Sequence, residues 1–143
     1  MNTSWNTIVV GYDDTESAQR ALARAADLAT NGEAKLVVTS VAPLLPPAVA
    51  ARGLGPTDPV DPPEAHRAEL AQARSFLEER GVSAEFDLEF GEPAEAIVKV
   101  ADKHQADAIV VGTREPGLVD RLMRGSVSQG VSKQAHCDVI IVH

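Results

Sequence analysis

A glycine-bearing loop between an apolar run and a helical pattern is the segment of this sequence best suited to bind an anion. Apolar residues 109–111 run into Gly112, and Gly125 with Ser126 begins the next helical pattern. Glycine lets a ligand approach the backbone, and the N–H groups and positive dipole end of a helix favour phosphate. Ser126 can cap the helix or donate its hydroxyl to an anion. Taken alone, the loop favours a plain turn with a serine cap over a phosphate site.

The elements that must position this loop alternate along the chain between strand and helix patterns. Short β-branched or alternating runs predict five strands, at residues 8–10, 36–41, 82–90, 109–111 and 139–142. Apolar residues at helical spacing predict four helices between them. Capping side chains precede three of these helices: one of Asp13, Asp14 and Thr15 before the first, Glu92 before the third and Ser126 before the fourth. Gly32 and Gly81 end two of them.

This alternation predicts an α/β fold, a single open parallel five-stranded sheet with helices on both faces. The strand at 82–90 alternates apolar and acidic residues, so it belongs at an edge, whereas the apolar strands at 8–10 and 109–111 belong in the middle. The strand order 3-2-1-4-5 satisfies both demands. Ligands of such sheets bind where the strand order reverses, here at the ends of the first and fourth strands, 11–13 and 112–114.

Composition indicates one domain over residues 1–143, with a proline-rich surface excursion at 43–63. Hydrophobic residues make up 44% of the 143 residues and aromatic residues only 3%, so the core must be aliphatic. The net charge of −8 disfavours nucleic acid and anionic membrane surfaces as partners. The lone Cys137 and the absence of an apolar leader lead us to expect a cytoplasmic protein.

Catalytic and metal-binding patterns are not found in the sequence. The four histidines lie on different elements without zinc-type spacing, so we expect surface or capping roles for them. No glycine–x–serine–x–glycine elbow supports a hydrolase triad. We therefore expect no catalytic residues, no metal ligands, and at most weak nucleotide hydrolysis.

Four stretches of the chain together resemble the universal stress protein family. They are Ile8-Val-Val-Gly-Tyr-Asp13, Gly91-Glu-Pro-Ala-Glu-Ala-Ile97, Ala106-Asp-Ala-Ile-Val-Val-Gly112, and the region from Gly125-Ser126-Val127 to Val142. The resemblance implies a Rossmann-like fold and a stress-response regulator that binds an adenine nucleotide. ATP or another adenine nucleotide is the implied ligand, with Mg²⁺ as a candidate companion.

The nucleotide-binding branch of that family carries glycine, two residues, glycine, nine residues, then glycine with serine or threonine. Gly112 and the pair Gly125-Ser126 keep this spacing, but Glu115 occupies the middle glycine position. By the same resemblance Asp13 contacts the nucleoside and Val41 packs on the base. The implied nucleotide-binding residues are Gly11, Tyr12, Asp13, Val41, Gly112, Thr113, Arg114, Glu115, Gly125, Ser126, Val127 and Ser128.

Glu115 leaves two functions open. A carboxylate repels phosphate: two unit charges ~4 Å apart cost about 1 kcal/mol in water and about 4 kcal/mol near a protein surface. Glu115 can turn outward, be offset by Arg114, Arg121 or Arg124, or stand in a rebuilt loop in which Gly117 partly replaces the missing glycine. The alternative to nucleotide binding is a dimeric adaptor whose phosphate loop is impaired by Glu115.

The last strand predicts how copies of the chain associate. Residues 139–142 are apolar at every position, so both faces of the strand should be covered, yet the strand order places it at an edge. Unpaired N–H and C=O groups on such an edge favour pairing with another chain. We therefore expect a homodimer through Val139, Ile140, Ile141 and Val142, unless residues 43–63 cover the edge.

Overall fold

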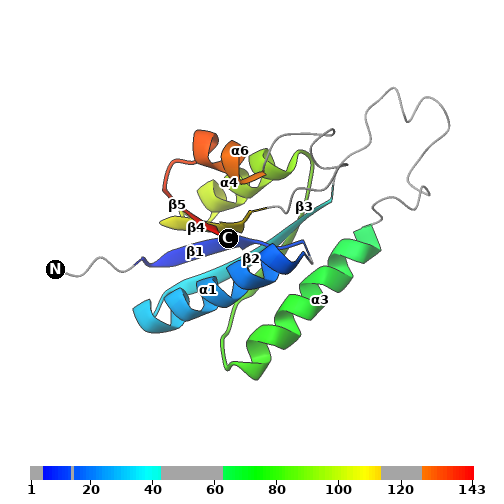
Figure 1. Ribbon diagram of the computed structural model, residues 1–143, viewed down its shortest axis with the longest axis vertical. Helices are drawn as coiled ribbons and strands as arrows, with labels where there is room; N and C mark the ends of the chain where they lie inside the picture. The colour runs from blue at the N-terminus through cyan, green and yellow to red at the C-terminus, as the bar shows by residue number, and fades with distance from the viewer. Residues whose placement is uncertain (1–4, 14, 43–62, 114–126) are drawn as a thin grey trace.

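The computed structural model describes residues 5–13, 15–42, 63–113 and 127–143 as one sheet flanked by helices (Figure 1). Strands and helices alternate along the chain: β1 (Thr7–Gly11), α1 (Glu16–Gly32), β2 (Lys35–Ala42), α3 (Pro63–Glu79), β3 (Glu85–Phe90), α4 (Pro93–Lys103), β4 (Ala108–Gly112), α6 (Val127–Gln134) and β5 (Asp138–Val142). Among these residues no helix is long and apolar enough to cross a membrane.

The five strands are parallel and follow the order β3-β2-β1-β4-β5, which confirms the predicted topology. β1 lies at the centre, where Val9 pairs with Val37 of β2 on one side and with Ile109 of β4 on the other. Helices α1 and α3 cover one face of the sheet, and α4 and α6 cover the other (Figure 1). The carboxyl ends of β1 and β4 are therefore adjacent. The helix that follows β1, α1, lies on one face of the sheet, and the helix that follows β4, α6, lies on the other.

The core is mostly aliphatic on both faces, as the low aromatic content predicts, and Tyr12 is its one buried aromatic side chain among the described residues. Ile8 and Val10 are fully buried on the face covered by α1 and α3, and Val9 is fully buried on the face covered by α4 and α6. Helix α1 packs on the sheet through small side chains, because alanines bring its backbone close to the strands. Its buried apolar residues are Ala18, Ala21, Leu22, Ala25, Ala26 and Ala29.

Two predicted boundaries shift in the structure. Helix α1 includes Gly32, and the left-handed residue that ends it is Glu33, with φ 55°. This conformation costs a residue with a Cβ about 1–2 kcal/mol, which the bond from the Glu33 N–H to the Ala29 carbonyl helps to offset. The third strand begins at Glu85 rather than at residue 82, because its pairing with β2 starts where Glu85 lies opposite Val37.

Strand β5 lies at a sheet edge and pairs with β4, as predicted. Both of its faces contact the core of the same chain: Ile140 and Val142 pack on the side of α1, and Val139 and Ile141 on the side of α4 and α6. All four side chains nevertheless stay only partly buried. The expectation that both faces are covered is thus met only in part within one chain.

Candidate functional site

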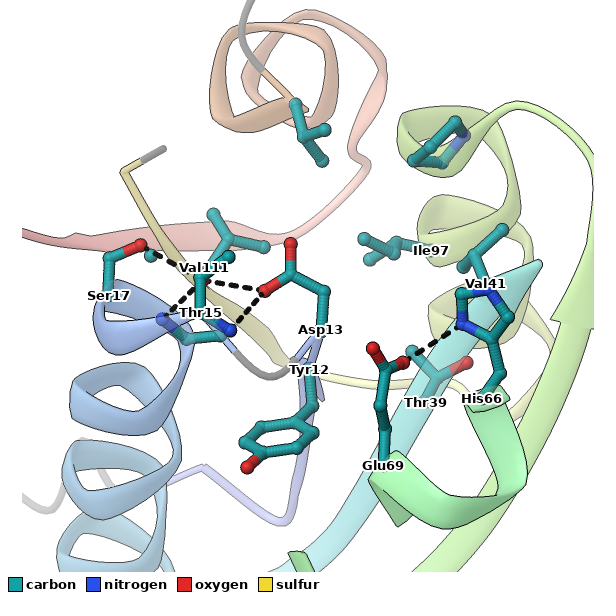
Figure 2. Close-up of a pocket in the computed structure, with 15 residues that line it drawn as sticks. Tyr12, Asp13, Thr15, Ser17, Thr39, Val41, His66, Glu69, Ile97 and Val111 are labelled. Carbon is teal, nitrogen blue, oxygen red and sulfur yellow. Dashed lines mark hydrogen bonds and ion pairs between the residues drawn. The ribbon is translucent and has the colours of Figure 1, made fainter. Parts of the chain in front are cut away.

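A cavity of about 180 Å³ opens at the carboxyl ends of β1, β2 and β4, at the predicted reversal of strand order (Figure 2). Strand ends, with the residues that follow β1, provide one part of its lining and the helices provide the rest. The lining residues are Gly11, Tyr12, Asp13, Thr39, Val41, Val111 and Gly112 from the strands, and Thr15, Ser17, Ala18, His66, Glu69, Pro93, Ile97 and Val127.

Asp13 is fixed in this cavity by the residue that caps α1. Its Oδ1 accepts hydrogen bonds from the Thr15 backbone N–H at 3.1 Å and from the Thr15 hydroxyl at 2.6 Å. The Thr15 Oγ1 in turn accepts from the Ala18 N–H at 3.1 Å, so Thr15 is the N-cap of the helix. The sequence left the cap open between Asp13 and its neighbours. Thr15 takes that role, and the Asp13 carboxylate lines the cavity (Figure 2).

Gly112 lets the start of α1 pass directly over the end of β4. A Cβ at this position would lie 2.4 Å from the Ser17 carbonyl oxygen and 2.6 Å from the Ser17 carbonyl carbon. Both are backbone atoms and cannot rotate away. At Gly11 a Cβ would instead meet the Ile97 Cδ1 at 2.9 Å, the flexible end of a side chain. Close helix–strand packing is therefore sufficient to require glycine at 112.

Apolar side chains form the wall of the cavity on the side of α4 and α6. Val41 extends from the end of β2, Ile97 and Pro93 from α4, and Val111 from β4, and Val127 begins α6. Figure 2 shows Ile97 pointing toward the centre, opposite Asp13. Aliphatic side chains of this kind can pack on the face of a flat ring, with polar groups at its edges.

A buried polar cluster forms the wall on the side of α3. The Ser40 hydroxyl donates to Glu69 Oε1 at 2.9 Å, and His66 Nδ1 lies 2.9 Å from the same oxygen and 3.1 Å from the Ser40 Oγ. Burial raises the pKa of the Glu69 carboxyl above its ordinary value, against the opposing effects of the Ser40 hydrogen bond and the His66 charge, and the Asp13 charge raises it further. The side chains of His66 and Glu69 are only 8% and 18% exposed.

This cluster was not among the residues predicted from the sequence. The prediction of a surface or capping role is wrong for His66, which is buried, although it holds for His104, the C-cap of α4, and for the exposed His136. A pattern was available: His66 extends the apolar stripe of α3, four residues before Leu70 and eleven before Leu77. A histidine on such a stripe must be buried with a partner, here three residues further on at Glu69.

The predicted site residues divide into three groups. Gly11, Tyr12, Asp13, Val41, Gly112 and Val127 line the cavity. Two others do not: the Thr113 N–H donates to the Val142 carbonyl at 2.9 Å and ties β4 to β5, and Ser128 is buried in α6. The remaining four lie outside the described residues: Arg114, Glu115, Gly125 and Ser126. No group of three or more metal-ligating side chains occurs within the described part of the chain.

The sheet order and the cavity at its switch point define a doubly wound, Rossmann-like α/β protein. The profile of the Universal stress protein family matches residues 4–143, and the chain belongs to that family, as the sequence led us to expect. Universal stress protein Rv1636 of Mycobacterium tuberculosis (strain ATCC 25618 / H37Rv) is 33% identical over 154 aligned residues, which cover 99% of this chain and 98% of the relative.

Solved structures of the same family superpose over nearly the whole chain. A universal stress protein in complex with cAMP is 29% identical, with a TM-score of 0.75 and coverage of 99% of both chains. The universal stress protein from Archaeoglobus fulgidus in complex with dAMP is 27% identical, with a TM-score of 0.71, and covers 99% of this chain and 100% of that one.

Proposed function

We propose that this chain binds an adenine nucleotide in the cavity at the ends of β1, β2 and β4, and that binding regulates its interactions in a stress response. The observation that carries the proposal is the cavity itself, which combines Asp13, the apolar wall around Val41 and Ile97, and the start of α1 at one switch point. Two solved structures of relatives with the same fold are complexes with cAMP and with dAMP. Nothing in the proposal requires catalytic turnover.

The polarity of the cavity orients the ligand. Phosphate belongs near Gly112 and Val127, where β4 ends and α6 begins, since helix N-termini favour negative charge. The opposite side carries the carboxylates of Asp13 and Glu69, which repel phosphate. The nucleoside therefore belongs between Asp13 and the wall formed by Val41 and Ile97.

The cAMP and dAMP of these relatives indicate which part of the nucleotide is recognised. A cyclic 3′,5′-phosphate leaves no free 3′-hydroxyl, and a deoxynucleotide has no 2′-hydroxyl. Neither ligand therefore presents the complete ribose diol, whereas both present an intact adenine ring. We accordingly expect the base, more than the sugar, to determine which nucleotides this chain accepts.

Isothermal titration calorimetry with AMP, cAMP, ATP with and without Mg²⁺, and adenosine tests the proposal. Asp13→Asn should weaken nucleotide binding about tenfold or more, because a charged hydrogen-bond acceptor is lost. The matched control is Asp27→Asn, a carboxylate on the exposed side of α1 whose side chain is 66% exposed. Absence of binding by the unmodified protein would reject the proposal and favour the adaptor function.

Assembly through β5 is part of the same proposal. Among the described residues β5 pairs with β4 alone, and its four apolar side chains stay partly exposed. A two-fold dimer in which β5 meets its own copy would cover this edge and leave no further edge to extend. Light scattering at micromolar concentration should give twice the chain mass of 15.1 kDa, and a strictly monomeric mass would reject the dimer.

A further inference from the structure

Glu69 presents a hydrogen-bond acceptor that the described part of the chain does not use. Its Oε1 is held by the Ser40 hydroxyl at 2.9 Å and by His66 Nδ1 at 2.9 Å. Its Oε2 makes no hydrogen bond within residues 5–13, 15–42, 63–113 and 127–143, and the side chain lines the cavity. Ser40 and His66 thus fix the carboxylate while one of its oxygens stays available to a ligand.

Thr39 provides a second, independent sign that the cavity takes a polar ligand group. It precedes Ser40 on β2, so its side chain lies on the opposite face of the sheet, that of Val37 and Val41; it is fully buried and lines the cavity. Its Oγ1 has no hydrogen-bond partner among the described residues. A buried hydroxyl without a partner is uncommon, because desolvation without a hydrogen bond is costly. A ligand with polar groups on both sides of the cavity would satisfy Thr39 and Glu69.

The place of Glu69 in the cavity indicates which part of a ligand it meets. Figure 2 shows Glu69 and His66 on the side of α3, across the cavity from Ser17 and the start of α1. Phosphate is assigned to the end where α6 begins, and carboxylates repel it from this one. The group that meets Glu69 must instead be a neutral hydrogen-bond donor at the base end of the ligand. Adenine has one such group on its ring edge, the 6-amino group.

We propose that Glu69, held in place by Ser40 and His66, accepts a hydrogen bond from the 6-amino group of the bound adenine and so selects adenine over 6-oxopurines. This inference rests on the proposed function, since it requires an adenine nucleotide in the cavity. A site that hydrogen-bonds one ligand group strongly rejects an analogue that lacks the group, because its own polar atom is then left unpaired. Asp13, anchored to Thr15, contacts the nucleoside without reading the base.

Calorimetry with AMP and inosine 5′-monophosphate, which has an oxo group at position 6, tests this assignment. The unmodified protein should bind AMP about tenfold or more tightly than the inosine nucleotide. In Glu69→Gln the amide oxygen can keep the Ser40 hydrogen bond, which leaves the NH₂ group facing the ligand in place of Oε2. The ratio of AMP affinity to inosine nucleotide affinity should then fall about tenfold. The introduced NH₂ group is a donor, so it opposes the 6-amino group of AMP but can donate to the 6-oxo group of the inosine nucleotide.

Two control variants separate base recognition from general effects. Glu79→Gln makes the same change on the exposed end of α3 and should leave both affinities unchanged. Asp13→Asn should weaken both nucleotides by the same factor and preserve their ratio. An unchanged preference in Glu69→Gln, while both nucleotides still bind, would overturn the role of Glu69 and leave nucleotide binding intact.

A measurement on the unmodified protein guards against a variant that fails to fold. Purine riboside 5′-monophosphate lacks the 6-amino group and is otherwise AMP. It should bind about tenfold or more weakly than AMP. Equal affinity for the two would overturn the assignment of Glu69 without any substitution, whereas no binding of AMP would overturn both the proposed function and this inference.

Discussion

Gly112→Ala should destabilise the protein because α1 begins directly over the end of β4. The added Cβ would lie 2.4 Å from the Ser17 carbonyl oxygen and 3.0 Å from the Ala18 backbone nitrogen, whereas ordinary contact begins at 3.4 Å. Relief requires the first turn of α1 to move by about 1 Å, the difference between 3.4 and 2.4 Å. That turn is closely packed, since Ser17 and Ala18 are only 2% and 4% exposed. Overpacking of this kind costs roughly 1–3 kcal/mol.

Gly11→Ala is the matched control for this prediction. Gly11 ends the neighbouring strand and lines the same cavity, but its added Cβ meets only the flexible end of Ile97, at 2.9 Å. A small rotation of Ile97 removes that contact, so the free energy of unfolding should change by less than about 1 kcal/mol. Both substitutions remove the same backbone freedom from the unfolded chain, so their difference isolates the contact with α1.

Urea denaturation followed by circular dichroism measures both variants without any ligand. We expect Gly112→Ala to lower the free energy of unfolding about 2 kcal/mol more than Gly11→Ala does, with a fall in Tm of roughly 4 °C per kcal/mol. Equal stabilities for the two variants would show that α1 adjusts freely over β4. Close packing would then not explain why residue 112 is glycine. The remaining explanation would be that a ligand must approach the backbone there.

Three further predictions concern the cavity and the segment between β4 and α6. Thr39→Val should raise the free energy of unfolding by about 1 kcal/mol in urea denaturation, because it removes a buried hydroxyl that has no partner among the described residues; a loss of stability would contradict this. Burial raises the pKa of Glu69 above its ordinary 4.5, so this group contributes stability below pH 4.5 that is lost as pH rises through the folded-state pKa. The unmodified protein loses this contribution between about pH 4 and 7, whereas Glu69→Gln does not. The Tm of the variant minus that of the unmodified protein should therefore increase over this range, and a constant difference would refute the effect of burial. Glu115→Gly, argued from sequence alone, should strengthen ATP binding more than adenosine binding, and equal gains in calorimetry would exclude charge repulsion.

The strand order was predictable because the strands differ in how many of their faces are buried. β1 and β4 are apolar at successive positions, which fits a strand covered by helices on both faces. β3 alternates, with Glu85, Asp87 and Glu89 between its apolar residues, and lies at the edge. These patterns also located the cavity, since the reversal of strand order follows from the order itself.

The polar wall of the cavity was not predictable in the same way. Ser40 and His66 are 26 residues apart, and Ser40 and Glu69 are 29 apart, so no local spacing connects them. Their contact depends on how α3 packs against β2 after a long proline-rich connection. Side-chain pairs of this kind are set by tertiary packing, which the periodicity of either element alone does not contain.

The cavity differs from the rest of the core because two of its polar groups are not satisfied by the described chain. The Thr39 hydroxyl is fully buried without a partner in those residues, and the Glu69 carboxyl is held where burial disfavours its charge. Folding alone would be served better by valine and by a neutral side chain at these positions. Both groups line one cavity at the switch point, so a single ligand can supply the missing hydrogen bonds to both. Such a ligand gains binding free energy from groups that weaken the fold, and it stabilises the folded chain by the same linkage.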